Sequence, residues 1–354
     1  MRVGGPAARV IEPATELELI DATRHLWRSD MWRTDDWLLL GGGSNVVVSD
    51  EGFDGTVIRV VTRGIEVAPG GGGRLRVQAG EPWDAVVECA VEKGWAGIEA
   101  LSGIPGSSGA APIQNIGAYG QELASSLVAV DLLDYPTGEL VHVPAAELEL
   151  GYRSSALKRG RLGLVVAIEL ALTESSEGVV EYAQLAQALG VQVGARVPIA
   201  TIRESVRALR ASKGMLLDDN DPDSVSCGSF FTNPIVGENF ARGLPGDAPR
   251  WLVESELEDR AVPLGSALPE LVGDRNDMVK LSAAWLIERS GIGKGFALPG
   301  SRAAVSAKHT LAIVNRGGAR AEEIAELARY IEARVLSEFG IHLQPEPVAI
   351  GLEL

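Results

Sequence analysis

The segment LLLGGGSNVVVSD, residues 38–50, places three consecutive glycines between two short apolar runs. A hairpin turn needs only one or two glycines, whereas bare backbone adopts positive φ freely and lets a ligand approach its N–H groups. A Walker A loop is excluded because Ser44 and Asn45 follow the glycines, where that motif needs Lys with Ser or Thr. A Rossmann fingerprint is excluded because the next run predicts a strand, not a helix. The segment predicts a strand–loop–strand, with a phosphate cradle and a simple turn as open alternatives.

A second glycine-rich segment, LSGIPGSSGAAPIQNIGAYG at residues 101–120, indicates a ligand more strongly. It contains too much glycine for a stable helix. Its apolar residues, including Ile104 and Ile113, favour burial over a disordered linker. Successive backbone amides in such loops form concave sites that bind anions such as pyrophosphate. These features favour a loop that holds a ligand.

Composition limits the class of protein. The 354 residues carry 32 basic and 48 acidic side chains, a formal net charge of −16, which argues against sequence-independent nucleic-acid binding. The two cysteines, Cys89 and Cys227, provide neither a disulfide framework nor a cysteine metal site. No apolar run reaches the ~20 residues of a membrane span, and the first residues lack a signal-peptide pattern. The sequence predicts a soluble cytoplasmic protein without metal, nucleic-acid or membrane partners.

Hydrophobic periodicity predicts the elements and their grouping. Helices are expected at residues 14–27, 83–94, 201–214, 279–291 and 321–340. Strands are expected in between, including a hairpin that turns at residues 136–138. We expect a first domain at residues 1–175, made of subdomains at about 1–62 and 63–175, a connecting segment at 176–204, and a second domain at 205–354.

Two stretches have no clear pattern of helix or strand. PGGGGR, residues 69–74, is expected to be a surface loop. Residues 237–277 are rich in Pro, Gly and acidic side chains and are expected to form an insertion on the surface. A docking site for a protein partner is the alternative for that insertion.

The two glycine segments together, LLLGGGSNVVVSDEGFDG and GIEALSGIPGSSGAAPIQNIGAYGQEL, resemble the FAD-binding half of the UDP-N-acetylenolpyruvoylglucosamine reductase family. The likeness continues in order through YRSSALK, RASKG, SCGSFFTNP, KLSAAWLIERSGIGKG and LQPEPVAIG, and so covers nearly the whole chain. It implies an α+β fold, with an FAD-binding domain of the vanillyl-alcohol-oxidase (PCMH) type followed by a C-terminal α+β substrate-binding domain. The last strand is expected to return to the first domain, and the glycines to bring the FAD diphosphate to backbone N–H groups.

The resemblance implies a monomeric oxidoreductase of peptidoglycan precursor synthesis, a UDP-N-acetylmuramate dehydrogenase. In that family NADPH reduces FAD, and the flavin N5 gives a hydride to the enolpyruvyl group of UDP-N-acetylenolpyruvoylglucosamine. Negative charge then develops next to a carboxylate. Such a site needs a cation or donor for the enolate and a group that protonates the neighbouring carbon.

Three residues match the family's catalytic positions. Arg153, in YRSSALK, matches the active-site arginine, and a guanidinium suits a carboxylate because it is always charged and donates two parallel hydrogen bonds. Ser229, in CGSFFTNP, matches the proton-donor serine, with Cys227 as a rival nucleophile. Glu346, in LQPEPVAIG, matches the glutamate that would hold the enolate with Arg153. Without the resemblance, a surface arginine, a turn serine and an exposed acid explain the same residues.

The resemblance also implies binding residues. Flavin contacts are expected in the two glycine segments and at one arginine: Gly41, Gly42, Gly43, Ser44, Asn45, Gly103, Pro105, Gly106, Ser107, Gly109, Ala110, Ala111, Asn115, Gly117, Ala118, Tyr119 and Arg210. Substrate contacts are expected at Tyr152, Tyr182, Lys213, Asn233 and Lys294. Tyr182 lies in VVEYAQLAQALGVQV, which resembles the extra substrate-covering segment found in one form of the family, and would close over the nucleotide.

Some positions depart from the family pattern. Pro347 and Val348 stand where some relatives have Val and then an arginine, so an arginine contact expected there must come from elsewhere. Ala110 and Ala111 stand where relatives often have Gly or Ser, which weakens only side-chain contacts. The chain also starts inside a family element, MRVGGPA, which leaves the first strand and an upstream segment open.

Two other functions fit parts of the pattern. An oxidase of the same fold often carries FAD on a His or Cys, but all four histidines lie outside the glycine segments: His25, His142, His309 and His342. A flavin or UDP-sugar sensor with a decayed site is disfavoured because the arginine, serine and glutamate of the catalytic pattern are all present.

Overall fold

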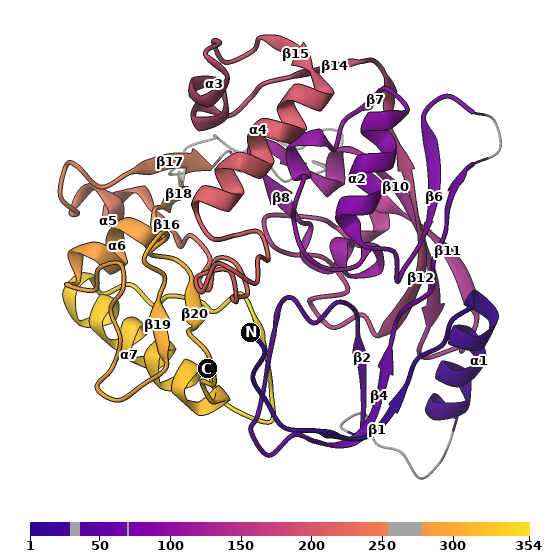
Figure 1. The fold of residues 1–354 in the computed structure, drawn as a ribbon, viewed down its shortest axis with the longest axis horizontal. Coiled ribbons are helices and arrows are strands. Elements are labelled where there is room, and N and C mark those ends of the chain that lie inside the picture. Colours follow the sequence, from indigo (N-terminus) through magenta and orange to yellow (C-terminus); the bar gives the residue numbers. More distant parts are fainter. Residues whose placement is uncertain (29–35, 69–70, 254–277) are drawn as a thin grey trace, which may run out of the picture.

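The computed structural model describes residues 1–28, 36–68, 71–253 and 278–354 (Figure 1). A parallel sheet of order β1–β4–β2 begins the chain, formed by β1 (Ala7–Ile11), β2 (Trp37–Leu40) and β4 (Phe53–Arg59). Helix α1 (Glu16–Trp27) connects its first two strands and starts where Thr15 accepts the N–H of Glu18, whose side chain in turn accepts the N–H of Thr15. This reciprocal pair satisfies two N–H groups that a helix start otherwise leaves free.

A five-stranded antiparallel sheet follows, of order β11–β10–β12–β6–β5. Its strands are β5 (Ile65–Val67), β6 (Arg74–Gln78), β10 (Leu127–Asp134), β11 (Leu140–Pro144) and β12 (Gly163–Ala171). The central strand β12 is buried on both faces, since Val166 packs with α1 whereas Ile168 packs with helix α2 (Trp83–Glu92). The predicted hairpin between β10 and β11 is confirmed, with Gly138 at φ +68° in its turn.

A small antiparallel pair lies over this domain (Figure 1). Strands β14 (Glu177–Val179) and β15 (Arg196–Pro198) enclose helix α3 (Ala183–Leu189), and helix α4 (Ile199–Ser212) follows. Apolar residues of α3 and α4 pack with Tyr119 of the second glycine segment and with Ala100, just before that segment. This packing, with hydrogen bonds from Arg203 to Ser102 and from Arg210 to Gly103, holds α4 against the second glycine segment.

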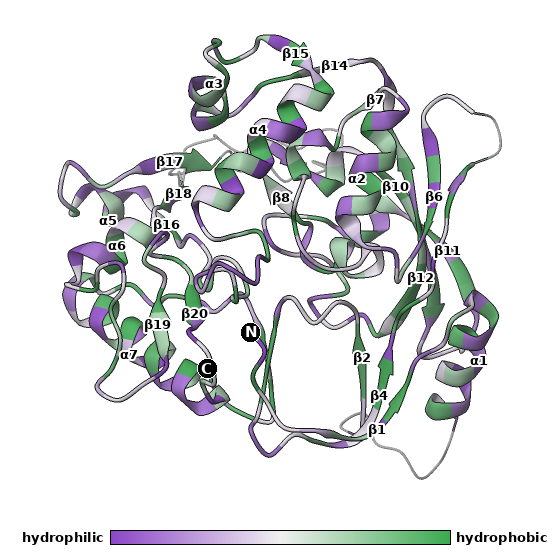
Figure 2. Cartoon of the chain, in the orientation of Figure 1, coloured by the Kyte–Doolittle hydropathy of each residue, from purple (hydrophilic) through white to green (hydrophobic). Residues whose placement is uncertain are grey.

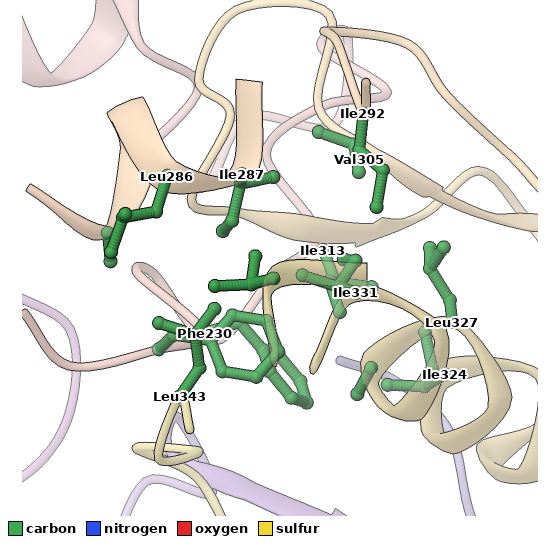
Figure 3. Packing of buried hydrophobic residues seen from close by; sticks show 14 of the residues in the cluster. Phe230, Leu286, Ile287, Ile292, Val305, Ile313, Ile324, Leu327, Ile331 and Leu343 are labelled. Atoms are coloured by element: carbon green, nitrogen blue, oxygen red, sulfur yellow. The ribbon is translucent and has the colours of Figure 1, made fainter. Parts of the chain in front are cut away.

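The second half has its own hydrophobic core, centred on Phe230, Ile287 and Ile331 (Figure 3). Its elements are α5 (Glu238–Arg242), β16 (Ile235–Gly237), β17 (Arg250–Val253), β18 (Met278–Leu281), α6 (Ala283–Arg289), β19 (Ala303–Val305), β20 (Ile313–Asn315) and α7 (Ala321–Phe339). Apolar and polar colours alternate along α7 in Figure 2, as expected for a helix with one buried face.

Two sequence expectations need correction here. The helix expected at residues 279–291 is a strand followed by a shorter helix, because Val279 and Leu281 are buried with strand periodicity and Ser282 caps α6 by accepting the N–H of Trp285. The insertion expected at 237–277 begins with two ordered elements, the helix α5 and the strand β17, and β17 joins the sheet β16–β18–β17. Residues 254–277, and residues 69–70 of the expected glycine loop, lie outside the described residues.

The end of the chain lies on the first half. Strand β21 (Val348–Ile350) pairs in parallel with β3 (Val46–Val48), which is separated from the three glycines by two residues. Val47 of β3 is fully buried in the core of the second half. Asp50, just beyond β3, accepts the N–H groups of Ala321 and Glu322 at the start of α7. These contacts join the first glycine segment, which belongs to the first half, to the core of the second half and to the end of the chain.

Short elements complete the described structure. Two-residue strands pair as β7 (Trp95–Ala96) with β13 (Thr173–Glu174) and as β8 (Gly117–Ala118) with β9 (Gln121–Glu122). A 3-10 helix, η3 (Ser108–Gln114), forms the middle of the second glycine segment, and the others are η2 (Glu99–Leu101), η4 (Leu123–Ser125) and η5 (Ala145–Leu148). Among the described residues, no helix is both long and apolar enough to cross a membrane.

Candidate active site

A cavity of about 520 Å³ is lined by both glycine segments and by residues of the second half. Most residues proposed as flavin contacts line it: Gly41, Gly42, Gly43, Ser44, Asn45, Pro105, Gly106, Ser107, Ala110, Ala111, Gly117, Ala118, Tyr119 and Arg210. The three proposed catalytic residues, Arg153, Ser229 and Glu346, line the same cavity, as do Tyr182 and Lys213. The fold therefore brings together segments that are far apart in the sequence.

The two glycine segments approach each other so closely that side chains on the glycines would collide with the opposite segment. A Cβ on Gly41 would lie 2.4 Å from Ser107 Oγ, and a Cβ on Gly42 would lie 3.1 Å from Gly106 Cα. Gly43 and Gly106 have φ values of +65° and +114°, which favour glycine. The absence of Cβ atoms lets the two loops approach each other in the wall of the cavity, and glycine-rich loops of this type bind anions such as pyrophosphate through backbone amides. These residues fit a flavin dinucleotide.

Three proposed flavin contacts lie beside the cavity and support its loops. Gly103 donates its N–H to Asp84 at 2.6 Å, and Gly109 donates its N–H to the carbonyl of Ala79 at 2.8 Å. Asn115 donates to Glu122 at 3.0 Å and to the carbonyl of Gly151 at 3.2 Å, and accepts the N–H of Ala124 at 2.9 Å. These hydrogen bonds shape the loop, and flavin contact at the three residues stays a prediction.

Arg210, on α4, provides positive charge from the wall of the cavity. It is only 8% exposed, and its Nε and Nη2 donate to the carbonyls of Gly103 and Met215 at 3.1 and 3.2 Å. Burial lowers its pKa, although an arginine stays charged at neutral pH. The side chain holds the second glycine segment against α4.

The three proposed catalytic residues meet through pairing between distant backbones. Glu346 donates its N–H to the carbonyl of Phe230 at 2.8 Å, which places the segment of Ser229 beside Glu346. Arg153 Nε lies 3.4 Å from Glu346 Oε1, and Arg153 Nη2 donates to the carbonyl of Gly117 at 2.8 Å. Arg153 has φ +51°, an unusual conformation for a residue with a side chain.

The surroundings of Glu346 shift the pKa of its carboxyl group above the ordinary value. Burial raises the pKa of its carboxyl group, whereas Arg153, Lys158 and a hydrogen bond from Gln114 lower it. Burial dominates because it removes water from the charged form. A carboxyl group held in this balance is suited to hold a proton close to a reacting centre.

Cys227, considered as a rival nucleophile, lines the cavity but is an unsuitable one. Its thiol is 3.6 Å from the carbonyl oxygen of Val46, to which it donates, and burial raises its pKa. A thiol must ionise to be a good nucleophile. The structure therefore disfavours Cys227 as a nucleophile.

Two of the proposed substrate-binding residues lie at one wall of the cavity. The rings of Tyr119 and Tyr182 make an edge contact with centroids 5.7 Å apart, and Lys213 Nζ lies 5.5 Å from the Tyr119 ring. Lys213 also donates to Gln184 of α3 at 2.7 Å. Burial lowers the pKa of Lys213, and the charge of Arg210 adds to this effect.

The other three proposed substrate contacts do not line the cavity. Tyr152 lies under Lys280, whose Nζ is 4.8 Å from the ring centroid. Asn233 accepts the N–H of Ala283 at 3.0 Å and so supports the start of α6. Lys294 lies close enough to His309 to lower its pKa. Their binding roles stay predictions.

Among the cavity residues that the sequence prediction did not include, three have polar or charged side chains: Gln114, Lys158 and His309. Gln114 and Lys158 lie inside quoted motifs, QNIGAYG and YRSSALK, so the motif was found and only the residue was missed. His309 had no signal of its own. Burial lowers its pKa from an ordinary 6.5 to about 4, so its imidazole is uncharged at neutral pH.

The family model described as UDP-N-acetylenolpyruvoylglucosamine reductase, C-terminal domain, matches residues 221–350, and the one described as FAD binding domain matches residues 7–144. The UDP-N-acetylenolpyruvoylglucosamine reductase of Leifsonia xyli subsp. xyli is 55% identical over 371 residues, spanning 100% of this chain and 97% of the relative. The chain belongs to the UDP-N-acetylenolpyruvoylglucosamine reductase family.

Other family members extend the likeness. The UDP-N-acetylenolpyruvoylglucosamine reductase of Mycobacterium tuberculosis is 43% identical over 361 residues, spanning 100% of this chain and 93% of the relative. The crystal structure of the UDP-N-acetylenolpyruvylglucosamine reductase from Thermus caldophilus superposes with a TM-score of 0.61 at 26% identity, covering 96% of this chain and 91% of that one.

The family assignment confirms the coarse predictions. The fold is an FAD-binding domain joined to the C-terminal domain of this reductase family, with mixed helix and strand content. The chain is an oxidoreductase and an FAD flavoprotein of peptidoglycan precursor synthesis, and its family acts on a small UDP-sugar.

Proposed function

We propose that the chain reduces the enolpyruvyl group of UDP-N-acetylenolpyruvoylglucosamine with NADPH, forming UDP-N-acetylmuramate. The observation that carries this proposal is the contact between Arg153 and Glu346 in a cavity that Ser229 also lines. FAD supplies the hydride-transfer chemistry when bound, held by the two glycine segments. Residues 1–175 then form the flavin domain, 205–354 the substrate domain, and 176–204 the connection.

Arg153 is proposed to bind the carboxylate of the enolpyruvyl group. Its guanidinium is oriented by the carbonyl of Gly117 on one side and by Glu346 on the other. The side chain is 21% exposed, so little water competes for its N–H groups. A fixed cation beside the carboxylate stabilises the charge that develops on the neighbouring carbon.

Ser229 is proposed to deliver a proton to the carbon that bears this carboxylate. A serine hydroxyl is a weak acid, so it protonates only a strongly basic carbon such as that of an enolate. Gly228, at φ +75°, turns the backbone just before it. Glu346, on the segment paired with Phe230, is proposed to help hold the enolate and to keep a proton available at its carboxyl group.

Lys213 and Tyr182 are proposed to bind the UDP part of the substrate. Lys213 would contact the diphosphate, because its ammonium group lines the cavity and lies beside the Tyr119 ring on this wall. Tyr182, at the start of α3, has 46% of its surface exposed and makes its ring contact with Tyr119 of the glycine segment. That position suits a side chain that covers the nucleotide.

The test follows the flavin spectrum of the purified protein without oxygen. Bands that bleach with NADPH and return with UDP-N-acetylenolpyruvoylglucosamine would support the proposal. Ser229→Ala should bleach normally and recover at least about 100-fold more slowly, since it lacks the proton donor. Ser212→Ala, which changes an exposed serine of α4, is the matched control.

Two outcomes would contradict the proposal. A protein that cannot be loaded with flavin would show that the glycine cradle holds another ligand. Bleached flavin that oxygen restores quickly, with no response to the enolpyruvyl sugar, would favour an oxidase of the same fold.

A further inference from the structure

A chain of side-chain amides joins the first glycine loop to the carboxyl group of Glu346. Asn45 Nδ2 donates to the backbone carbonyl of Glu346 at 3.2 Å and to Gln114 Oε1 at 3.1 Å. Gln114 Nε2 donates to Glu346 Oε1 at 3.2 Å. All three residues line the cavity, and they come from three separate segments of the chain.

The donor and acceptor roles in this series of hydrogen bonds follow from the chemistry of the groups involved. A backbone carbonyl can only accept, so Asn45 must turn its NH₂ group towards Glu346. The second N–H of that NH₂ group needs an acceptor, and Gln114 can offer only its oxygen there. Gln114 is therefore left with its NH₂ group facing the carboxyl group of Glu346. The orientation of both amides depends on one backbone carbonyl.

The consequence is an asymmetry between the two oxygens of Glu346. Gln114 Nε2 and Arg153 Nε both lie near Oε1, at 3.2 and 3.4 Å. An oxygen that accepts N–H groups has its lone pairs engaged and is a poor position for a proton. Oε2 is then the oxygen that carries the proton when Glu346 is neutral.

We propose that Gln114 is a positioning residue for Glu346: it engages Oε1, and so makes Oε2 the oxygen that exchanges a proton with the cavity. The inference deepens the proposed function, because it rests on the role of Glu346 at the reacting centre. Gln114 does so without charge, which distinguishes it from Arg153.

The charged and titratable groups around Glu346 come from several elements. Arg153 contacts it directly, and Lys158, which donates to the carbonyl of Arg153 at 3.1 Å, adds positive charge. Cys227 lies close enough for the charge of Glu346 to affect its thiol. Replacing Gln114 by an apolar residue of similar length leaves all of these charges in place.

The test is Gln114→Met in the flavin-loaded protein, with Gln187→Met, an exposed position on α3, as the matched control. Loss of the N–H donor favours the protonated carboxyl group, so the titration of Glu346 should move to higher pH by about one pH unit. Carbon-13 NMR of labelled glutamate follows this titration directly, and the resonance is identified by its absence in Glu346→Gln. The same shift is expected in the pH–rate profile for substrate reduction, in the limb that reports the titration of Glu346.

Asn45→Ser is a second variant, which removes the group that orients Gln114. In Asn45→Ser the titration of Glu346 should also move to higher pH. In the double variant it should move no further than in Gln114→Met alone, because Asn45 acts through Gln114. A Glu346 titration that is unchanged in Gln114→Met, with flavin bound, would overturn the proposal. A titration that moves in Gln114→Met while Glu346→Gln turns over normally would support the positioning contact and reject the proposed role of Glu346 in catalysis.

Discussion

Arg153 and Glu346 form an ion pair, with Nε and Oε1 3.4 Å apart and side-chain exposures of 21% and 14%. Arg153 lies between β11 and β12 of the five-stranded sheet, whereas Glu346 precedes the last strand of the chain. Removing one partner from a pair so little exposed leaves a charge without compensation. The pair therefore links the two halves at the point where the chemistry is proposed to occur.

Arg153→Lys tests the need for a guanidinium. Lysine keeps the charge and meets the same backbone strain at φ +51°, but it cannot donate two parallel hydrogen bonds. We expect kcat/KM for the enolpyruvyl substrate to fall by about 10²- to 10³-fold. Flavin absorbance of the purified variant measures cofactor loading. Arg159→Lys, an exposed arginine paired with Glu149, is the control and should keep full activity. Normal kcat/KM in Arg153→Lys would contradict the proposed carboxylate contact.

His309 should make stability depend on pH. Its pKa is about 4 in the folded protein, mainly through burial, against an ordinary 6.5. The unfolded chain therefore binds a proton between pH 6.5 and 4 that the folded protein does not bind. The stabilising contribution is present above pH 6.5 and is lost as the pH falls towards 4.

Urea unfolding of His309→Gln over this pH range measures the effect. The variant should lose less stability on acidification, by up to about 2 kcal/mol, because partial exposure reduces the full linkage value. His25→Gln, at an exposed position of α1, should follow the wild-type curve. Equal pH dependence in wild type and His309→Gln would show that this imidazole is not buried in its neutral form.

Gly109→Ala tests the packing that supports the second glycine segment. The new Cβ would lie 2.5 Å from the Cβ and 3.0 Å from the Cα of Ala79, and the hydrogen bond between the two residues prevents separation. We expect a loss of about 1–3 kcal/mol in the free energy of unfolding. Adding Ala79→Gly removes the nearest atom and should recover part of this loss. A Gly109→Ala variant as stable as wild type would contradict the close approach.

Asp50→Ala tests the contact between the end of the first glycine segment and the start of α7. Asp50 accepts the N–H groups of Ala321 and Glu322 at 2.8 and 3.2 Å, which the start of a helix otherwise leaves unpaired. The free energy of unfolding should fall by about 1 kcal/mol, and amide exchange should increase in the first turn of α7. Glu51→Ala removes the neighbouring exposed acid and should leave both measurements unchanged. Unchanged exchange in Asp50→Ala would exclude this cap.

Local patterns explain which predictions succeeded. Helix α7 carries a long apolar stripe and ends at Gly340 in the left-handed conformation, so its bounds follow from nearby residues. The helix expected at 279–291 was wrong at its start because Val279 and Leu281 pair with two strands that come earlier in the chain. Nothing within a few residues of Val279 specifies those partners.

The sequence by itself determined the glycine segments, the family and the cofactor class, because these depend on residue types at short spacing. Only the tertiary structure decided that Glu346 faces Arg153 and Gln114, since parallel pairing of β21 with β3 brings the end of the chain back to the first glycine loop. It also decided that Gly109 packs against Ala79, beside the cavity. Burial, hydrogen-bond direction and the resulting pKa values depend on what distant segments place around a side chain, and a local motif does not contain that information.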